Sequence, residues 1–225
     1  MEISDKNKYI AFSILIGGKS TRFGTDKGLF KFKGKPLISY QLETLSRFNH
    51  DIFLVANSQH QIQNYINEID ITKIMAFILD DYDIILNQNV RSPILGLYST
   101  FKELKKLTYQ KVFVFSCDNP LFSFEVIDYM IKESDQYDCY MPKWNNGFRE
   151  PLFAIYPVEK AYKTSLRNLK QKQYKLTKII DEDWTVKYVS IEQNIKYLDP
   201  NLLSFKNINK LADIKTLKSV SDKNL

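Results

Sequence analysis

Cysteine and histidine are scarce in this chain, which has only two residues of each type among 225. The two cysteines, Cys117 and Cys139, are too few for a disulfide scaffold. The two histidines, His50 and His60, do not stand at metal-ligand spacing from a cysteine or a carboxylate. We therefore expect neither a zinc site nor a histidine-based catalytic triad.

Long hydrophobic runs and clustered charge are also missing. The first apolar run, residues 9–16, is too short to span a bilayer, and the polar residues 1–8 do not resemble a secretory segment, so we expect a cytosolic protein without a membrane partner. The net charge is +6, but the basic residues are interleaved with 26 acidic ones. No cluster of cations with stacking aromatics is present, which argues against a nucleic-acid-binding module.

Strand-like apolar runs alternate with segments of helical period. The predicted strands are residues 9–16, 52–56, 74–79, 111–116, 137–141, 152–156 and 184–189. The predicted helices begin at Pro36, near Ser58 and at Ser92, and cover 123–131, 158–169 and 209 to about 218. This alternation predicts an α/β fold, a three-layer α/β/α sandwich of Rossmann-like type with a mostly parallel central sheet, in a single domain over 1–225.

A glycine- and cation-rich loop follows the first predicted strand. Gly17 and Gly18 let backbone amides approach phosphate oxygens, while Arg22 and Lys27 add fixed positive charge. The loop is not a Walker A motif, because no Gly-Lys-Ser/Thr closes it. A glycine pair alone would be an ordinary connector, but the combination with an arginine and a lysine predicts a triphosphate-binding loop.

A carboxylate, Asp118, follows the fourth predicted strand. Ligands of open α/β sheets bind beyond the carboxyl ends of the strands, where Asp118 would face the glycine loop. Taken alone, an aspartate before Asn119-Pro120 is an ordinary turn residue. Opposite a phosphate loop it predicts a site for Mg²⁺, held together with phosphate oxygens. Its neighbour Cys117 is expected to be a small buried side chain, since no histidine is placed to activate it as a nucleophile.

Five ordered motifs give the chain a family resemblance. It resembles the molybdenum cofactor guanylyltransferases of the nucleotidyltransferase superfamily through GGKSxRxGxDKG at 17–28 with GKPL at 34–37, SPILG at 92–96, CDNP at 117–120, EPLFAIY at 150–156 and FKNIN at 205–209. The resemblance implies transfer of GMP from GTP to the terminal phosphate of molybdopterin, with release of pyrophosphate and with Mg²⁺ as cofactor.

The resemblance also implies roles for individual residues. Arg22, Lys27 and Asp118 would be catalytic, with Asp118 as the metal ligand. An aspartate after the third strand would contact the nucleotide, and Asp81 is the best match, with Asp80 close behind. The implied nucleotide contacts are Leu15, Ile16, Gly17, Gly18, Lys27, Asp81, Ser92 and Asp118, and the implied acceptor contacts are Asn207 and Asn209.

Several alternatives stay open within this resemblance. Ile16, Val55 and Ser92 depart from the family pattern near the base, so a cytidylyltransferase or a sugar-phosphate nucleotidyltransferase is the nearest rival, although Asp26-Lys27-Gly28 argues against the former. Another alternative is a homologue that binds the nucleotide but does not catalyse a reaction. We expect a nucleotide-binding half at about 9–120 and an acceptor-binding half at about 121–220, with transient contacts to the enzymes that accept the cofactor.

Overall fold

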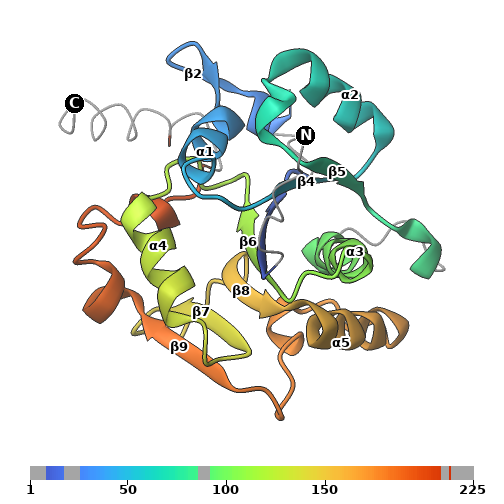
Figure 1. The fold of residues 1–225 in the computed structure, drawn as a ribbon, viewed down its shortest axis with the longest axis vertical. Helices are drawn as coiled ribbons and strands as arrows, with labels where there is room; N and C mark the ends of the chain where they lie inside the picture. Colours follow the sequence, from blue (N-terminus) through green and yellow to red (C-terminus); the bar gives the residue numbers. More distant parts are fainter. Residues whose placement is uncertain (1–8, 18–25, 86–91, 209–212, 214–225) are drawn as a thin grey trace, which may run out of the picture.

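The fold is built on a seven-stranded sheet (Figure 1). The computed structural model describes residues 9–17, 26–85, 92–208 and 213. The strands lie side by side in the order β5-β4-β1-β6-β8-β7-β9. Their bounds are β1 Ile10–Leu15, β4 Ile52–Ala56, β5 Ala76–Leu79, β6 Lys111–Ser116, β7 Cys139–Lys143, β8 Phe153–Pro157 and β9 Val186–Ser190.

Strand direction places one edge of the sheet where a ligand would bind. β1 is central and runs parallel to both neighbours, with Ile14 opposite Leu54 of β4 and Phe115 of β6. β4 and β5 are also parallel, so the carboxyl ends of all four strands meet at one edge. β8 is antiparallel to β6 and β7, whereas β7 and β9 are parallel. The predicted mostly parallel sheet is confirmed.

Helices cover both faces of the sheet because β1 is apolar on both of its sides. Ile10, Phe12 and Ile14 face the layer formed by α1, α2 and α4. Ala11 and Leu15, which point the opposite way, face α3 and α5. Figure 1 shows α3 and α5 together on one side of the sheet, with α1 and α4 on the other. The helices are α1 Leu37–Leu45, α2 Gln59–Glu68, α3 Pro93–Lys106, α4 Phe124–Glu133 and α5 Val158–Lys170.

Most predicted elements are found within two or three residues of their predicted bounds. Ser58 caps α2 as expected, since its hydroxyl accepts a hydrogen bond from the amide of Gln61 at 3.2 Å. The hairpin of β2 (Lys31–Phe32) and β3 (Lys35–Pro36) was not predicted, because strands of two residues carry no periodic signal. The predicted helix at 209–218 lies outside the described residues, except for 213.

Short helical turns complete the connections. Two of them lie near the carboxyl edge of the sheet, directly after the glycine loop and after β5. The 3₁₀ turns are Lys27–Leu29, Ile71–Lys73, Tyr82–Ile84, Leu176–Lys178 and Leu203–Phe205, and Ile191–Ile195 forms a π turn.

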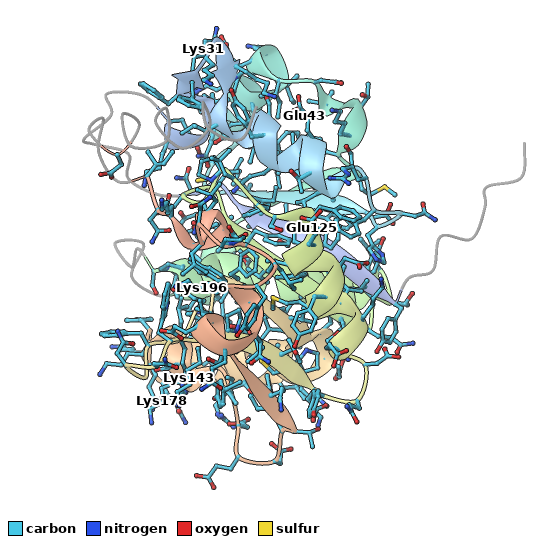
Figure 2. All side chains as sticks on the ribbon, turned by 90° about the vertical axis from the view of Figure 1, so that its left-hand side faces the viewer. Lys31, Glu43, Glu125, Lys143, Lys178 and Lys196 are labelled. Carbon is cyan, nitrogen blue, oxygen red and sulfur yellow. The ribbon has the colours of Figure 1, made fainter. Side chains whose placement is uncertain are left out.

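The state of the two cysteines agrees with the sequence. Cys117 and Cys139 are both free and buried. In Figure 2, Lys31 lies at the upper end of the molecule, and Lys143, Lys178 and Lys196 lie in its lower half. None of the helices in the described part of the chain combines the length and the hydrophobicity that a bilayer span requires.

We predict that Phe12→Ala lowers the free energy of unfolding by about 3–5 kcal/mol, because it leaves a cavity in the core. Phe12 is fully buried, and its ring meets those of Phe48, Phe113 and Phe115. Urea unfolding of both proteins measures the difference. Phe148→Ala is the control, since Phe148 is 71% exposed and its loss should change stability by less than about 0.5 kcal/mol. A loss below about 1 kcal/mol for Phe12→Ala would contradict this packing.

Candidate active site

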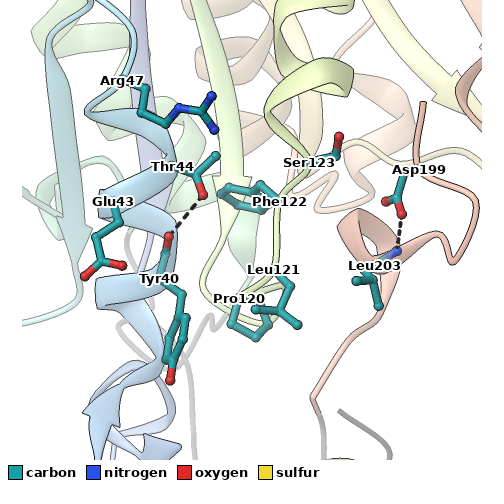
Figure 3. Close-up of a pocket in the computed structure, with 10 residues that line it drawn as sticks. All are labelled: Tyr40, Glu43, Thr44, Arg47, Pro120, Leu121, Phe122, Ser123, Asp199 and Leu203. Carbon is teal, nitrogen blue, oxygen red and sulfur yellow. Dashed lines mark hydrogen bonds between the residues drawn. The ribbon is translucent and has the colours of Figure 1, made fainter. Parts of the chain in front are cut away.

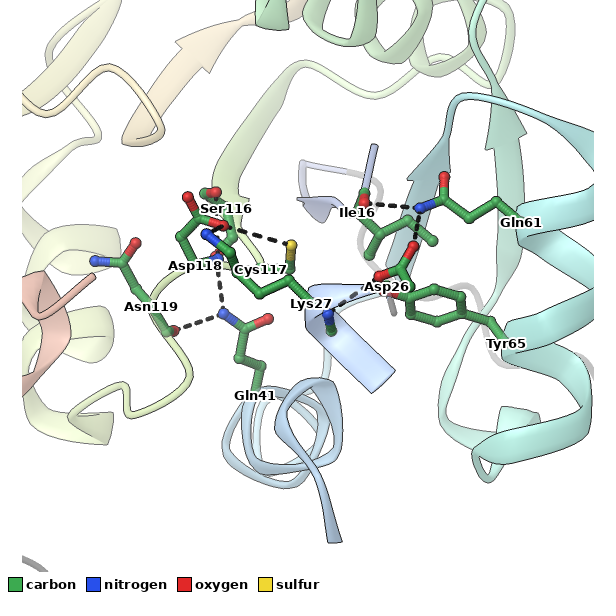
Figure 4. Close-up of polar contacts among 11 residues, drawn as sticks. Ile16, Asp26, Lys27, Gln41, Gln61, Tyr65, Ser116, Cys117, Asp118 and Asn119 are labelled. Atoms are coloured by element: carbon green, nitrogen blue, oxygen red, sulfur yellow. Dashed lines mark hydrogen bonds and ion pairs between the residues drawn. The ribbon is translucent and has the colours of Figure 1, made fainter. Parts of the chain in front are cut away.

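The structure brings Lys27 and Asp118 together at the carboxyl edge of the sheet (Figure 4). Lys27 follows the glycine loop after β1, and Asp118 follows β6, which pairs with β1. The Lys27 ammonium lies 2.9 Å from Asp118 Oδ1, and the two side chains are 13% and 35% exposed. Two residues that were predicted to act together are thus in direct contact, at an edge of the sheet where their side chains are partly exposed to solvent.

Lys27 is placed by a network on its neighbour Asp26. The carboxylate of Asp26 accepts hydrogen bonds from the Gly28 amide at 3.1 Å and from the Tyr65 hydroxyl at 2.6 Å, both on Oδ1. Its other oxygen accepts from the side chain of Gln61. Gly28 must lack a Cβ, which would stand 2.2 Å from the Tyr65 hydroxyl. The Asp-Lys-Gly motif therefore has a structural reason at each position.

Asp118 is placed by a second network. Gln41 of α1 is fully buried, and its side-chain amide donates to the carbonyls of Ser116 at 2.8 Å and Asn119 at 2.6 Å. These carbonyls stand on either side of the turn that carries Asp118. Cys117 lies in the same turn, and burial raises the pKa of its thiol well above the ordinary value. The prediction that Cys117 is a buried side chain is confirmed.

Two aspartates follow β5, and they face different partners. Asp81 forms an ion pair with Lys102 of α3 at 2.5 Å, and its backbone amide donates a hydrogen bond to the Ser99 hydroxyl at 2.8 Å. Asp80 has a buried oxygen without a hydrogen-bond partner in the described part of the chain. Burial raises the pKa of Asp80 from 3.8 to about 7. The geometry therefore favours Asp80 over the predicted Asp81 as the ligand-facing carboxylate.

Asp80 lies close to the start of the glycine loop. A Cβ built on Gly17 would stand 3.8 Å from Asp80 Oδ2, and one built on Gly96 would stand 3.4 Å from Oδ1. The Gly96 Cβ would also stand 3.2 Å from Leu15, so glycine lets α3 approach the end of β1. These contacts bring Gly17, Leu15 and Asp80 into one corner of the sheet edge.

Ile16, which departs from the family pattern, does not add bulk to this corner. Its side chain is 2% exposed and packs in the core between the sheet and the α1 layer. Its backbone amide and that of Gly17 both donate to the carbonyl of Val55, at 2.9 and 3.2 Å. The Val55 side chain is itself buried, in the core on the α3 side. The two departures therefore fall in the core.

The remaining predicted residues are placed only in part. Ser92 caps α3, with its hydroxyl 3.4 Å from the Ile94 amide and 3.1 Å from the Tyr174 carbonyl. Asn207 is exposed, and the next residue, Ile208, donates its amide to the Asp118 carbonyl at 2.8 Å. The 205–208 segment therefore lies beside the Asp118 turn. Gly18, Arg22 and Asn209 lie outside the described residues.

A hollow of about 420 Å³ lies beside the same turn (Figure 3). Its Arg47 stacks on Phe124, with the guanidinium carbon 3.8 Å from the ring centre. The groups that meet at the sheet edge, Lys27, Asp80 and Asp118, do not line it. Its lining is Tyr40, Glu43, Thr44, Arg47, Pro120, Leu121, Phe122, Ser123, Asp199 and Leu203.

The donor set fits a magnesium ion that is shared with phosphate. Within the described residues, no group of three or more His, Cys, Asp or Glu side chains could hold a metal alone. Mg²⁺ usually takes one or two carboxylates and completes its shell with water and substrate phosphates. Asp118 already faces a cation, Lys27, and is partly exposed, so its carboxylate suits this kind of site.

Gln41, Gln61 and Tyr65 were not predicted as site residues from the sequence. All three lie on buried helix faces, where a polar residue reads as an exception to the apolar pattern. One signal was present: Ser58 and Gln61 have capping-box spacing. The side-chain oxygen of Gln61, however, accepts a hydrogen bond at 2.9 Å from the backbone amide of Asn57, the residue before the capping residue Ser58.

Comparison with known proteins identifies relatives over most of the chain. Residues 12–187 match the family described as "MobA-like NTP transferase domain". The "probable molybdenum cofactor guanylyltransferase" of Pyrococcus horikoshii is 34% identical over 209 residues, covering 90% of this chain and 95% of that protein. A protein of the same description from Natranaerobius thermophilus is 31% identical, covering 89% and 91%. The crystal structure of molybdopterin-guanine dinucleotide biosynthesis protein A from Archaeoglobus fulgidus has a TM-score of 0.73 at 26% identity, covering 95% of this chain and 99% of that chain.

We predict that Asp80→Asn stabilises the nucleotide-free protein increasingly as the pH rises from about 4 to about 7. The pKa of Asp80 is raised from 3.8 to about 7 in the folded state, so folding retains a proton that the unfolded chain releases in this window. The wild type then loses up to about 1.4 kcal/mol per pH unit, and the penalty is complete above pH 7.

Thermal unfolding across the pH range measures this difference. Asp70→Asn is a control of opposite sign, because hydrogen bonds from Thr72 lower the pKa of Asp70. That variant should lose stability above pH 4 relative to the wild type. A stability difference between Asp80→Asn and wild type that does not vary with pH would contradict the buried position of the Asp80 carboxylate.

Proposed function

Because the chain belongs to the family of MobA-like NTP transferase domains and is a nucleotidyltransferase, we propose that it transfers GMP from GTP to the terminal phosphate of molybdopterin. The products would be a guanine dinucleotide cofactor and pyrophosphate. The observation that carries the proposal is the Lys27–Asp118 pair at the carboxyl edge of the sheet, in which Lys27 is the last residue of the glycine-rich sequence. The names of the relatives support the choice of GTP and of the pterin acceptor.

The reaction is a single displacement at phosphorus. An oxygen of the acceptor phosphate forms a bond to the α-phosphorus of GTP, and the bond between the α-phosphorus and its bridging oxygen to the β-phosphate breaks. The acceptor phosphate is already an anion near neutral pH, so the step needs no general base. Positioning and charge neutralisation then supply the catalysis.

We assign these tasks to named residues. Lys27 would bind the triphosphate and stabilise the charge that develops on the leaving pyrophosphate, together with Arg22. Leu15, Ile16 and Gly17 would contact the nucleotide through the backbone at the end of β1. The remaining nucleotide contacts, Gly18 and Ser92, stay predictions from family resemblance.

Asp80 suits the nucleoside part of the ligand better than Asp81 does. It has a buried oxygen that is free to accept a hydrogen bond, whereas the Asp81 carboxylate binds Lys102. A ribose hydroxyl or a base amine would supply the missing donor. Nucleotide binding would then keep Asp80 ionised, which its burial alone disfavours.

Asp118 would hold the Mg²⁺ ion. When bound there with the phosphates, the ion supplies charge neutralisation and orients the phosphate oxygens. Lys27 would exchange its present partner, Asp118, for the triphosphate. Gln41 keeps the Asp118 turn closed while the partners change.

The acceptor would bind on the other side of Asp118. Asn207 and Asn209 are proposed contacts of its phosphate, and the Ile208–Asp118 backbone bond supports this place for the segment. We also propose a nucleotide-binding half at about 9–120 and an acceptor-binding half at about 121–220. We further propose that the protein is cytosolic and makes transient contacts with the enzymes that accept the cofactor.

We predict that Lys27→Ala lowers turnover about 10²–10³-fold and weakens GTP binding, since it removes a charge that faces the phosphates. Asp118→Ala should abolish Mg²⁺-dependent turnover and leave the fold intact, because its side chain is partly exposed. Pyrophosphate release from GTP in the presence of molybdopterin and Mg²⁺ measures both effects.

Lys106→Ala is the matched control for this measurement. Lys106 forms an exposed ion pair with Glu103 on α3, so its loss should leave turnover unchanged. Near-normal turnover of Asp118→Ala would show that the metal assignment is wrong.

A further inference from the structure

One buried glutamine binds both ends of the glycine loop. The Nε2 group of Gln61 donates to the Ile16 carbonyl at 2.9 Å and to the carboxylate of Asp26 (Figure 4). Ile16 precedes the loop and Asp26 ends it, so the two acceptors form the neck of the loop. Gln61 is 6% exposed and belongs to α2, which packs under the neck.

The chemistry of the carboxamide suits this position. Its nitrogen carries two hydrogens in one plane and therefore can bridge two acceptors at once. Its oxygen accepts from the Asn57 amide at 2.9 Å, which fixes the orientation of the group. The opposite orientation would turn the oxygen towards a carbonyl and a carboxylate. A buried Ile16 carbonyl and Asp26 carboxylate would also lose a donor if Gln61 were replaced.

Tyr65 strengthens the same neck from the next turn of α2. It is fully buried, and its hydroxyl donates to Asp26 Oδ1 at 2.6 Å. Burial, with Cys117 and Asp26 nearby, raises the pKa of the Tyr65 hydroxyl, which thus stays a proton donor. Both oxygens of Asp26 are therefore fixed, and Lys27 is the next residue along the chain.

We propose that Gln61 is a positioning residue for Lys27. It closes the neck of the glycine loop and thereby holds Lys27 in register with Asp118, without touching the substrate. The inference rests on the proposed function for its catalytic consequence, but the closed neck is a property of the nucleotide-free protein. Tyr65 assists through the second oxygen of Asp26.

The first test needs no substrate. Gln61→Met keeps the length of the side chain but removes both donors, and Gln63→Met is the matched control, since Gln63 is exposed on the same helix and bonds Asn67. Hydrogen–deuterium exchange of the nucleotide-free proteins should be about tenfold or more faster over residues 16–17 and 26–30 in Gln61→Met and unchanged in Gln63→Met. Unchanged exchange in Gln61→Met would overturn the proposal, whatever the protein's substrate is.

The second test separates positioning from general stability. Gln61→Met should lower kcat for pyrophosphate release about 10- to 100-fold and should change KM for GTP much less, because misplacing a catalytic group costs mainly transition-state binding. In a Lys27→Ala background the same substitution should cost less than about threefold, because the group that it positions is gone. If Gln61→Met lowered kcat by the same factor in the wild type and in Lys27→Ala, Gln61 would act only on the stability of the fold, and the proposal would be overturned.

Tyr65→Phe provides a milder variant in case Gln61→Met folds poorly. This substitution removes the hydrogen bond that the Tyr65 hydroxyl donates to Asp26. It should therefore lower kcat as well, but by a smaller factor than Gln61→Met. Tyr65→Phe should also reduce the steric clash caused by Gly28→Ala, because the new Cβ would otherwise stand 2.2 Å from the Tyr65 hydroxyl. A wild type that binds and turns over no GTP would count against the proposed function, while the exchange measurement still decides the closed neck.

Discussion

The ion pair between Lys27 and Asp118 is the contact on which the other features of the site depend. It joins the loop after β1 to the turn after β6 at 2.9 Å. Both groups are partly shielded from water, so their mutual attraction is stronger than that of a surface pair. In the proposed reaction each of them has a more highly charged partner, a triphosphate for Lys27 and a metal ion for Asp118. The ion pair therefore marks the place where these two ligands would meet.

The rest of the fold holds these two charges at the same edge. β1 pairs in parallel with β4 and β6, so the segments that follow the strands converge there. Gln61 binds the neck of one loop, and Gln41 binds the neck of the other, each with both hydrogens of its amide. Residues 117–123, which include Asp118, form no helix or strand. The buried side-chain amides of Gln41 and Gln61 supply hydrogen bonds to backbone carbonyls at the necks of the two loops, as neighbouring strands do within the sheet.

The sequence predicted the sheet and helices well, because strands buried on both faces read as continuous apolar runs. It also paired Lys27 with Asp118, since the carboxyl ends of neighbouring parallel strands meet at one edge. It preferred Asp81 to Asp80, whereas the geometry favours Asp80: adjacent residues in an extended segment point to opposite sides, and motif matching is uncertain by one position. Gln41 and Gln61 were missed because three of the four groups to which their side-chain amides donate are backbone carbonyls far along the chain, and a carbonyl has no signal in the sequence.

The central claim is that this edge of the sheet binds GTP together with Mg²⁺. Thermal stabilisation of the purified protein by GTP, CTP, ATP and UTP, each with and without Mg²⁺, tests it most directly. We expect the largest shift for GTP with Mg²⁺, about 2.7 kcal/mol of stabilisation at 100 times the dissociation constant. A larger shift with another nucleotide would keep the fold and the phosphate site but contradict the choice of base. No shift with any of the four nucleotides would contradict the claim itself.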